Sequence, residues 1–276
     1  MDESLSHWLG LREPADAMAR SEALTRTIAG AVPASEPVCV LDLATGTGSN
    51  IRYLMDRLPG RQRWLAVDRD AALLAELSER MSSWGAAKSY TVRTEPGLCI
   101  IRGASLECDI ETRQMDLGAL EDREIFAGRH LVTASALFTI SYNGRSSCDP
   151  AEPEDDIVRD LMNQHQRRDK GLGGPAAGPD AIACAERCFA EAGYSVQREP
   201  SDWTLGPDVA ALQRMLIDGW AHAATEMLRD RPATIASWRA RRLAHIDAGR
   251  SRLVVGHDDL AAWPPRAQGV PDQIRT

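Results

Sequence analysis

The stretch VCVLDLATGTGSN, residues 38–50, decides the fold of this chain. Its first half, Val38–Leu43, is a short apolar run interrupted by Asp42, and such a run is typical of a parallel strand buried on both faces. The second half consists of small residues, among which Gly46 and Gly48 tolerate a tight turn and let a ligand approach the backbone. The residues after the loop have apolar side chains at the spacing of a helix. The stretch therefore predicts a strand, a tight loop and a helix.

Strand and helix patterns alternate along the rest of the chain. Further strands are expected at residues 64–68, 130–135, 138–143, 193–199 and 252–257. Helices are expected at residues 15–28, 50–58, 70–81, 153–165, 179–192, 207–229 and 234–248. Residues 89–115 alternate around turn signals and predict an antiparallel excursion that merges into a third strand, ending at Asp116. The order predicts an α/β fold with a doubly wound, mostly parallel seven-stranded sheet, a β excursion before strand three and a helical insertion before the last strand.

Length and composition limit the classes of protein. A chain of 276 residues can form one large domain, and we expect a single domain over 1–276, with an N-terminal helical cap at 1–35 and the helical insertion at 207–248. The net charge of -8 would repel a phosphate backbone, so we expect no nucleic-acid partner. No apolar stretch approaches the roughly 18 residues that span a bilayer, and the N-terminus lacks a signal pattern, so no membrane partner is expected.

The six cysteines are scattered and lie mostly in apolar runs, which suits a reducing cytoplasm. Cys184 and Cys188 could share one helix face, but no second pair of ligands accompanies them. We therefore expect them to be packing residues, and we expect no metal site.

One junction conflicts with a parallel sheet. The strands expected at 130–135 and 138–143 are separated only by Ala136 and Leu137, whereas parallel neighbours need a crossover of about a dozen residues. Either residues 130–143 form one long strand, or a segment is missing between about Ala136 and Phe138. Our hypothesis is the missing segment.

A second acidic residue narrows the ligand class. Asp68 follows Gly48 by twenty residues and ends the second expected strand, where a carboxylate can accept hydrogen bonds from ribose hydroxyls. A dinucleotide fingerprint would require a third glycine where Ile51 stands, and Ile51 would crowd a pyrophosphate. This pattern disfavours a nicotinamide enzyme and favours an adenosyl ligand, provided that Asp68 faces a cavity beside the bend.

The order of an acid, one spacer and then small-x-Gly-x-Gly resembles the pattern of class I (Rossmann-like) S-adenosylmethionine-dependent methyltransferases of the small-molecule type. Ala44 replaces the first glycine that is usual in that family. The resemblance covers residues 36–145 and extends to the last strand, RLVVGH. It implies S-adenosyl-L-methionine as the cofactor and methyl transfer as the activity.

The resemblance also implies roles for individual residues. Asp42 would lie near the cationic methionine portion, Asp68 would bind ribose and Asp116 would accept the adenine amino hydrogen. Leu117 and Arg69 would flank the base. The cofactor-binding residues expected in this way are Asp42, Ala44, Thr45, Gly46, Gly48, Asn50, Asp68, Arg69, Asp116, Leu117, Thr133, Ala134 and Ser135.

The acceptor is expected to be a small metabolite with an oxygen or nitrogen nucleophile. The fourth expected strand ends in VTASAL, in place of the Asn/Asp-Pro-Pro-aromatic tetrad with which related enzymes grip a nucleobase amino group. His165 is our candidate for a general base, because histidine titrates near neutrality without help. The substrate candidates are Tyr142, Asn143, Arg145, Asp169 and Lys170. A solvated helix end is the alternative interpretation of His165, Asp169 and Lys170.

Further side chains are candidates for the walls of the site. Arg12 and Arg20 could pair with the methionine carboxylate, since arginine suits bidentate recognition of carboxylates, and the alternative interpretation is that these helix arginines are simply exposed. Trp203, Trp220 and His222 could line the pocket, although helical apolar spacing also fits Trp220 to a core.

Two other functions stay open from the sequence. A protein of the same fold could use the cofactor for chemistry other than methylation, such as cyclisation or decarboxylation. The chain could also be a non-catalytic cofactor-binding module. No motif identifies the acceptor atom or an oligomeric state.

Overall fold

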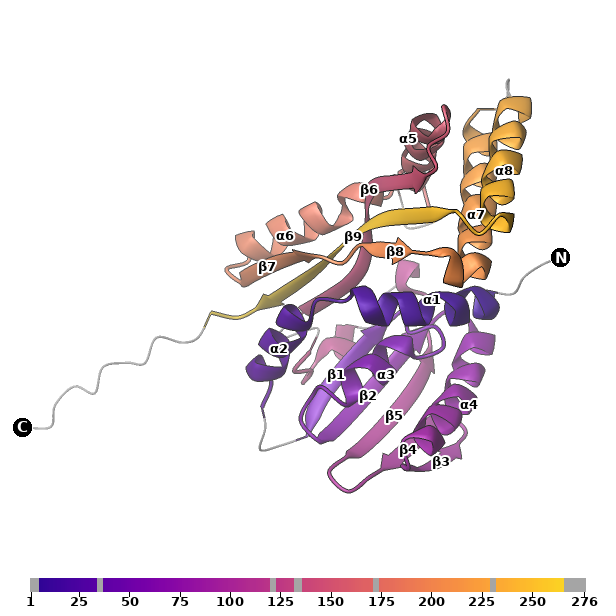
Figure 1. The fold of residues 1–276 in the computed structure, drawn as a ribbon. Coiled ribbons are helices and arrows are strands. Elements are labelled where there is room, and N and C mark those ends of the chain that lie inside the picture. Colours follow the sequence, from indigo (N-terminus) through magenta and orange to yellow (C-terminus); the bar gives the residue numbers. More distant parts are fainter. Residues whose placement is uncertain are drawn as a thin grey trace, which may run out of the picture.

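The computed structural model describes residues 5–33, 37–119, 123–131, 136–170, 174–228 and 232–265 (Figure 1). Its helices are α1 (Leu5–Ala19), α2 (Glu22–Ala31), α3 (Ser49–Met55), α4 (Ala71–Ala87), α5 (Asp155–Gln166), α6 (Ala181–Glu191), α7 (Ala210–Met227) and α8 (Pro232–Asp247). Its strands are β1 (Val38–Leu43), β2 (Arg61–Asp68), β3 (Thr91–Glu95), β4 (Leu98–Arg102), β5 (Glu107–Gln114), β6 (Ala136–Asp149), β7 (Ser195–Pro200), β8 (Trp203–Leu205) and β9 (Arg252–Trp263). None of the helices described is long and apolar enough to cross a membrane.

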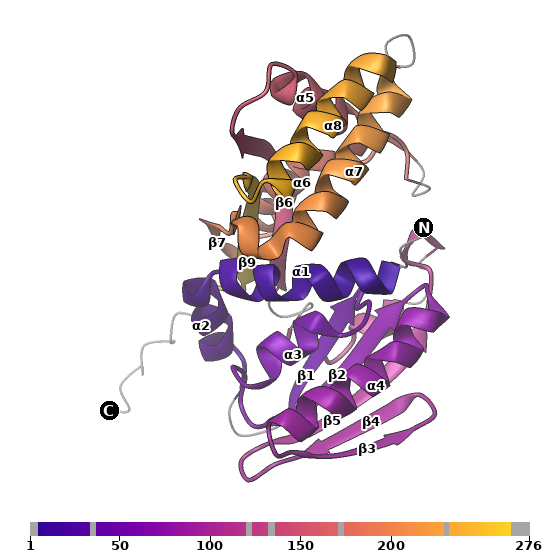
Figure 2. The same cartoon turned by 45° about the vertical axis from the view of Figure 1, so that its right-hand side comes forward.

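The first sheet contains the expected strand, loop and helix. Its strand order is β1-β2-β5-β4-β3, in which β1, β2 and β5 run parallel and the hairpin of β3 and β4 is antiparallel. The hairpin confirms the predicted β excursion before the third parallel strand. Helices α3 and α4 lie over one face (Figure 2), where Ile51 and Leu77 pack with Val40 and Trp64 in the main core. A fully buried apolar face explains why these strands read as continuous apolar runs.

The second sheet corrects the predicted topology. Its order is β6-β9-β7, with β8 also paired to β9, and all of these pairs are antiparallel. The described residues thus form a mixed five-stranded sheet and a separate antiparallel sheet, and one continuous seven-stranded, mostly parallel sheet is not observed. Helices α7 and α8 stand between β8 and β9 in the chain, which confirms the predicted helical insertion.

The conflict at Ala136 and Leu137 disappears in this arrangement. The three consecutive residues Ala136, Leu137 and Phe138 pair with three consecutive residues of β9, so the strand passes through this point without a break. The pairing gives no support to our hypothesis of a missing segment. One long strand over residues 130–143 is not observed either, because β6 begins at Ala136 and Leu131 pairs with β1. Of the fourth expected strand, Leu131 forms a parallel bridge with Val40, while residues 132–135 lie outside the described part.

The N-terminal region forms two helices, where the sequence predicted one over residues 15–28. The break falls at Ser21, whose hydroxyl accepts a hydrogen bond from the Leu24 amide (3.2 Å) and caps α2. The two helices then contact different parts of the protein. Apolar residues of α2 join the core of the first sheet, whereas α1 packs on the second core and lies across the junction of the two halves (Figures 1 and 2).

Asp259 connects the break between α1 and α2 to the second sheet through two hydrogen bonds. Its carboxylate is 1% exposed and accepts hydrogen bonds from the amides of Ser21 (2.8 Å) and Ile140 (2.7 Å). Ile140 has a φ of 51°, which is rare for a β-branched residue, and the pairing of β6 with β9 shifts register between Phe138 and Ser141. A buried carboxylate with two backbone donors therefore fixes the bend of β6 and the start of α2 together.

Candidate functional site

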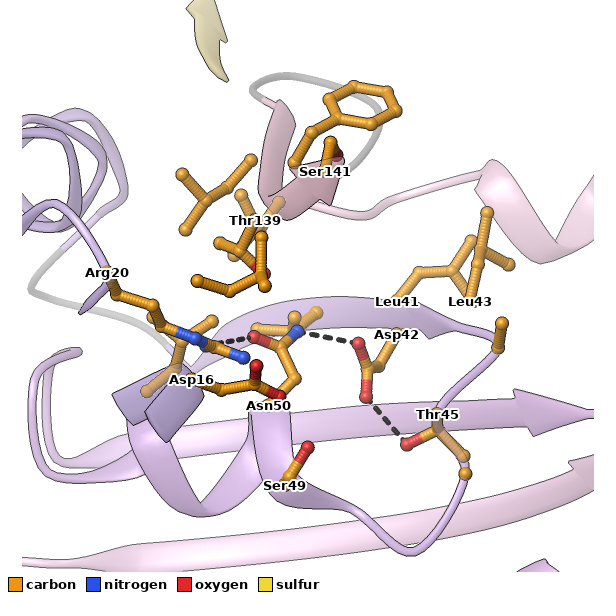
Figure 3. A pocket seen from close by; sticks show the side chains of 18 of the residues that line it. Asp16, Arg20, Leu41, Asp42, Leu43, Thr45, Ser49, Asn50, Thr139 and Ser141 are labelled. Atoms are coloured by element: carbon orange, nitrogen blue, oxygen red, sulfur yellow. Dashed lines mark hydrogen bonds between the residues drawn. The ribbon is translucent and has the colours of Figure 1, made fainter. Parts of the chain in front are cut away.

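A cavity of about 360 Å³ opens where β1 ends and the bend begins (Figure 3). Its floor comes from β1, the bend and the start of α3, its side from α1, and its far wall from the first residues of β6. The lining residues are Leu9, Arg12, Asp16, Arg20, Val40, Leu41, Asp42, Leu43, Ala44, Thr45, Gly46, Thr47, Ser49, Asn50, Leu54, Leu131, Ala136, Leu137, Phe138, Thr139, Ile140 and Ser141. The carboxyl ends of parallel strands are where open α/β sheets bind ligands.

Backbone hydrogen bonds shape the bend. The amide of Thr45 donates to the Val67 carbonyl (3.0 Å), and the amide of Gly48 donates to the Thr45 carbonyl (2.9 Å). Gly46 has a φ of 55°, and a Cβ built there would lie 3.1 Å from the Leu9 side chain of α1. Glycine is therefore favoured by the backbone conformation and by the close approach of the N-terminal helix.

Ala44 also has a positive φ, 57°, although it carries a side chain. The left-handed region costs an L-residue about 1–2 kcal/mol, whereas glycine loses roughly 0.5–1 kcal/mol through its greater freedom in the unfolded chain. Ala44→Gly is therefore expected to raise the free energy of unfolding by about 0.5–1 kcal/mol, measured by urea denaturation. The matched control Ala23→Gly, on the exposed face of α2, should lower it by about 1 kcal/mol. A loss of stability in Ala44→Gly would contradict the strained conformation.

A chain of polar side chains crosses the cavity (Figure 3). Asp42 accepts hydrogen bonds from the Thr45 hydroxyl (2.6 Å) and the Asn50 amide nitrogen (2.7 Å). The amide oxygen of Asn50 accepts a hydrogen bond from Arg20 Nη1 (2.7 Å). Burial raises the pKa of Asp42, and the two hydrogen bonds oppose that rise by favouring the charged form. Asn50 thus links a carboxylate to a guanidinium across one cavity.

Arg20 is 7% exposed and lies over the Tyr53 ring, with its guanidinium carbon 4.4 Å from the ring centroid. Burial lowers the pKa of Arg20, while the neighbouring charges of Asp16, Asp259 and Asp42 act in the opposite direction. Its Nε is buried and has no hydrogen-bond partner among the described residues. A buried donor of this kind is uncommon in folded proteins and marks a position where a ligand could supply the acceptor.

The structure brings together the part of the predicted site that lies close in sequence. Asp42, Ala44, Thr45, Gly46 and Asn50 all line the cavity. Gly48 does not line the cavity and adopts a left-handed conformation (φ 82°) at the N-cap of α3. These positions agree with the prediction that the bend leaves room for a ligand.

Asp68 occupies a different place from the one its predicted role requires. Its side chain is 8% exposed and does not line the cavity, because one oxygen accepts the Gly46 amide (2.8 Å) and the other accepts the Asp70 amide (3.0 Å). Through these hydrogen bonds, Asp68 holds the bend against the end of β2. A carboxylate keeps free lone pairs after two such bonds, so ribose binding stays a prediction, which this geometry does not support directly.

The residues expected around adenine do not line the cavity at the bend. Arg69 and Asp116 line a separate open hollow of about 740 Å³, and Asp116 accepts the Gly118 amide (2.8 Å). Leu117 packs against a small apolar cluster that includes Val67, and its role beside a base stays a prediction. Thr133, Ala134 and Ser135 lie outside the described residues.

A second cavity, of about 460 Å³, adjoins the first. Its lining residues are Trp8, Arg12, Ile140, Tyr142, Met162, His165, Gln166, Trp203, Met215, Leu216, Gly219, Trp220, His222, Ala223, Val255 and His257. Arg12 and Ile140 line both cavities. Trp203, Trp220 and His222 face this cavity, as the sequence led us to consider.

The predicted substrate residues do not all lie at a cavity. Tyr142 lines the second cavity, donates a hydrogen bond to Asn163 (2.9 Å) and has its pKa raised to about 12 by burial. Asn143 and Arg145 line neither cavity, because Asn143 donates to Asp258 (3.0 Å) and Arg145 pairs with Asp202 (3.2 Å) at the surface.

Asp169 and Lys170 are exposed beyond the end of α5 and line neither cavity, which fits the alternative interpretation of a solvated helix end for these two residues. His165 lines the second cavity, where its Nε2 lies 3.2 Å from Glu226 Oε2. It does not line the cavity at the bend. Its role as a general base stays a prediction.

Sequence reasoning missed Leu9, Ile140 and His257. Leu9 reaches the bend from α1, and the other two lie on paired strands that are more than a hundred residues apart in sequence. Alternation along RLVVGH could have placed the side chain of His257 on the same face as Val255. The sequence contains no signal that connects that face with Trp8 or Arg12.

Comparisons with known proteins give only weak likenesses. No family model matches the chain, and no curated protein matches it. A SAM-dependent methyltransferase from Geobacter sulfurreducens, solved in complex with S-adenosyl-L-homocysteine, is similar at 13% identity over 90% of this chain and 92% of that chain, with a TM-score of 0.38.

Two further solved structures show the same degree of similarity. The YcgJ protein from Bacillus subtilis matches at 13% identity, over 88% of this chain and 98% of that chain, with a TM-score of 0.41. A cyclopropane synthase from Mycobacterium tuberculosis matches at 13% identity, over 87% and 82%, with a TM-score of 0.37. Likenesses this low carry no argument about activity, which therefore rests on the geometry of the site.

Proposed function

We propose that this chain is an S-adenosylmethionine-dependent methyltransferase that acts on an oxygen or nitrogen nucleophile of a small molecule. The observation that carries the proposal is the pair of opposite charges in the cavity at the bend. Asp42 and Arg20 line the same cavity, and Asn50 bridges them. A carboxylate and a guanidinium placed in this way complement the ammonium and carboxylate groups of an amino-acid moiety.

The residues present fit the methionine end of the cofactor. The unpartnered Nε of Arg20 is a donor for a carboxylate, and Asp42, which lines the cavity, is an acceptor for an ammonium group. The volume of about 360 Å³ lies within the range usual for ligand sites. When bound, S-adenosylmethionine would supply an electrophilic methyl group on a sulfonium. The contribution of the chain is to hold and orient that group and to exclude water.

The adenosine end is supported less directly. The bend offers a close approach to the backbone at Gly46, and Asp68 holds it in place. Ribose binding by Asp68 and adenine binding by Asp116 and Arg69 remain predictions. A single domain over residues 1–276 and a cytoplasmic location also remain predictions, as does the absence of nucleic-acid partners.

Binding of S-adenosylhomocysteine tests the proposal, since a ligand that binds only the native protein raises its melting temperature. Asp68→Ala is expected to lose most of that shift, because the Gly46 amide loses its acceptor and the bend is no longer fastened. The matched control is Asp109→Ala, which removes a carboxylate from the exposed side of β5 and should keep the full shift. An unchanged shift in Asp68→Ala would show that the hydrogen bond from Gly46 to Asp68 is not needed for ligand binding.

The two alternative functions predict different experimental results. Methylation adds one methylene unit to the mass of the acceptor, whereas cofactor turnover without that gain would indicate other chemistry on the same fold. Binding of S-adenosylhomocysteine without turnover across metabolite extracts would indicate a non-catalytic module.

A further inference from the structure

The second cavity gathers aromatic side chains from four elements. Trp8 comes from α1, Tyr142 from β6, Trp203 from β8 and Trp220 from α7. The chain has seven tryptophans in all, and three of them line this one cavity. Aromatic rings attract planar ligands through stacked and edge-to-face contacts. The cavity is therefore shaped for a flat, largely apolar molecule.

The polar side chains Arg12, His165 and His222 at this cavity each have a carboxylate partner. Arg12 forms an ion pair with Asp16 (3.0 Å), and His165 and His222 each lie 3.2 Å from Glu226. The walls thus offer no unpaired charge among the described residues, which favours an uncharged ligand.

A cationic ligand is disfavoured by Arg12. Its guanidinium carbon lies 5.3 Å from the centroid of the Trp203 ring, the distance at which a cation interacts with an aromatic face. A quaternary ammonium ligand would need the same face and would be repelled by the same charge.

His257 supplies a polar group inside this apolar space. Its ring packs against Trp203 (4.7 Å between centroids) and Tyr142 (6.1 Å), and its Nδ1 is buried without a hydrogen-bond partner among the described residues. Burial, followed by the charge of Arg12, lowers the pKa of His257 to about 4, against the opposing effects of Asp202, Asp258 and the backbone at Val255. The imidazole is therefore neutral near pH 7 and can bind a ligand hydroxyl or N–H.

The aromatic cavity is next to the cavity at the bend. Arg12 and Ile140 line both, and Ile140 holds a strained φ of 51° that Asp259 stabilises. Strained residues that are fixed by their surroundings cluster at functional sites. A molecule in the aromatic cavity would lie beside a cofactor held at the bend.

We propose that the aromatic cavity is the acceptor site and that it takes a planar, uncharged aromatic molecule whose hydroxyl or N–H group hydrogen-bonds to His257. This inference rests on the proposed function for its acceptor role. The binding of such a molecule is independent of the cofactor and can be measured without it.

The test uses 2-naphthol as the probe and isothermal titration calorimetry on the full chain. Gly219 lines the cavity on α7, and a Cβ there would meet no atom within 4 Å, so there is space for the first carbon of the side chain in Gly219→Leu. The rest of the leucine is expected to occupy part of the cavity, and leucine favours a helix more than glycine does. The variant is expected to weaken 2-naphthol binding at least tenfold. The matched control Gly30→Leu adds the same side chain to the exposed end of α2, away from the cavity, and should bind 2-naphthol as the unchanged protein does.

His257 is tested in the same way. His257→Phe keeps a ring but removes the nitrogen and is expected to weaken 2-naphthol binding about tenfold, whereas His257→Gln should recover part of the loss. Equal affinity in Gly219→Leu and the unchanged protein would overturn the proposed location. Binding of choline in preference to 2-naphthol would overturn the ligand class.

The melting shift with S-adenosylhomocysteine separates this inference from the proposed function. Gly219→Leu should keep the melting shift with S-adenosylhomocysteine but bind 2-naphthol more weakly. This pair of results would support two separate binding cavities. If the unchanged protein bound 2-naphthol but gave no shift with S-adenosylhomocysteine, the proposed function and the acceptor role would both be overturned. If the shift were present and 2-naphthol did not bind, the inference alone would fail.

Discussion

Arg20→Leu is expected to weaken the binding of S-adenosylhomocysteine by roughly 10–100-fold, because one charge-assisted hydrogen bond of about 1.5–3 kcal/mol is lost. The guanidinium of Arg20 lines the cavity at the bend, and its Nε has no hydrogen-bond partner among the described side chains. A ligand carboxylate would supply the missing acceptor. The dissociation constant from calorimetry is the measurement.

Two control variants distinguish the loss of a ligand contact at Arg20 from a general loss of stability. Arg26→Leu removes an exposed arginine of α2 and should leave the affinity unchanged. Arg20→Lys keeps the charge but loses the fork of the guanidinium, so an intermediate affinity is expected. Because Arg20 also lies among buried carboxylates, each variant is compared with its own melting temperature without ligand. Full affinity in Arg20→Leu would refute the proposed anchoring of the methionine end.

Asp155→Ala is expected to lower the free energy of unfolding by about 3–5 kcal/mol, which is usual when one partner of a buried ion pair is removed. Arg242 is 0% exposed and donates to Asp155 from Nε (2.9 Å) and from Nη2. Trp238 Nε1 also donates to Asp155 (2.8 Å). Without the carboxylate, a buried guanidinium and an indole N–H would lose their acceptor.

Urea denaturation measures this loss. The neighbouring Asp156 is exposed, so Asp156→Ala should change stability little and serves as the control on the same helix. The double variant Asp155→Leu with Arg242→Met removes both charges and should recover much of the loss. A single variant as stable as the unchanged protein would show that the pair does not hold α8 against α5.

The local parts of the fold and site could be predicted because their causes are local. The run VCVLDL, the glycines of the bend and the start of α3 follow one another along the chain, and each residue type limits its own backbone. Asp42 and Asn50 therefore reach the cavity from the segment that predicted it.

Asp68 shows where local reasoning stops. The sequence placed it correctly at the end of β2, but its partner could not be known, because the hydrogen bond to the Gly46 amide depends on how two segments pack. The same holds for β6, which the alternation of strands and helices predicted as part of a parallel sheet. Its antiparallel partner β9 begins more than a hundred residues later, and short-range patterns carry no information on such pairings.

The sequence by itself thus determined the strand, bend and helix around Asp42, since steric limits and apolar periodicity act within a few residues. Only the tertiary structure decided that Arg20 and Asn50 meet beside that bend, and that Trp8, Trp203 and His257 share one cavity. Those contacts arise from the burial of apolar surface between elements that are remote in sequence, and burial of this kind depends on the whole fold.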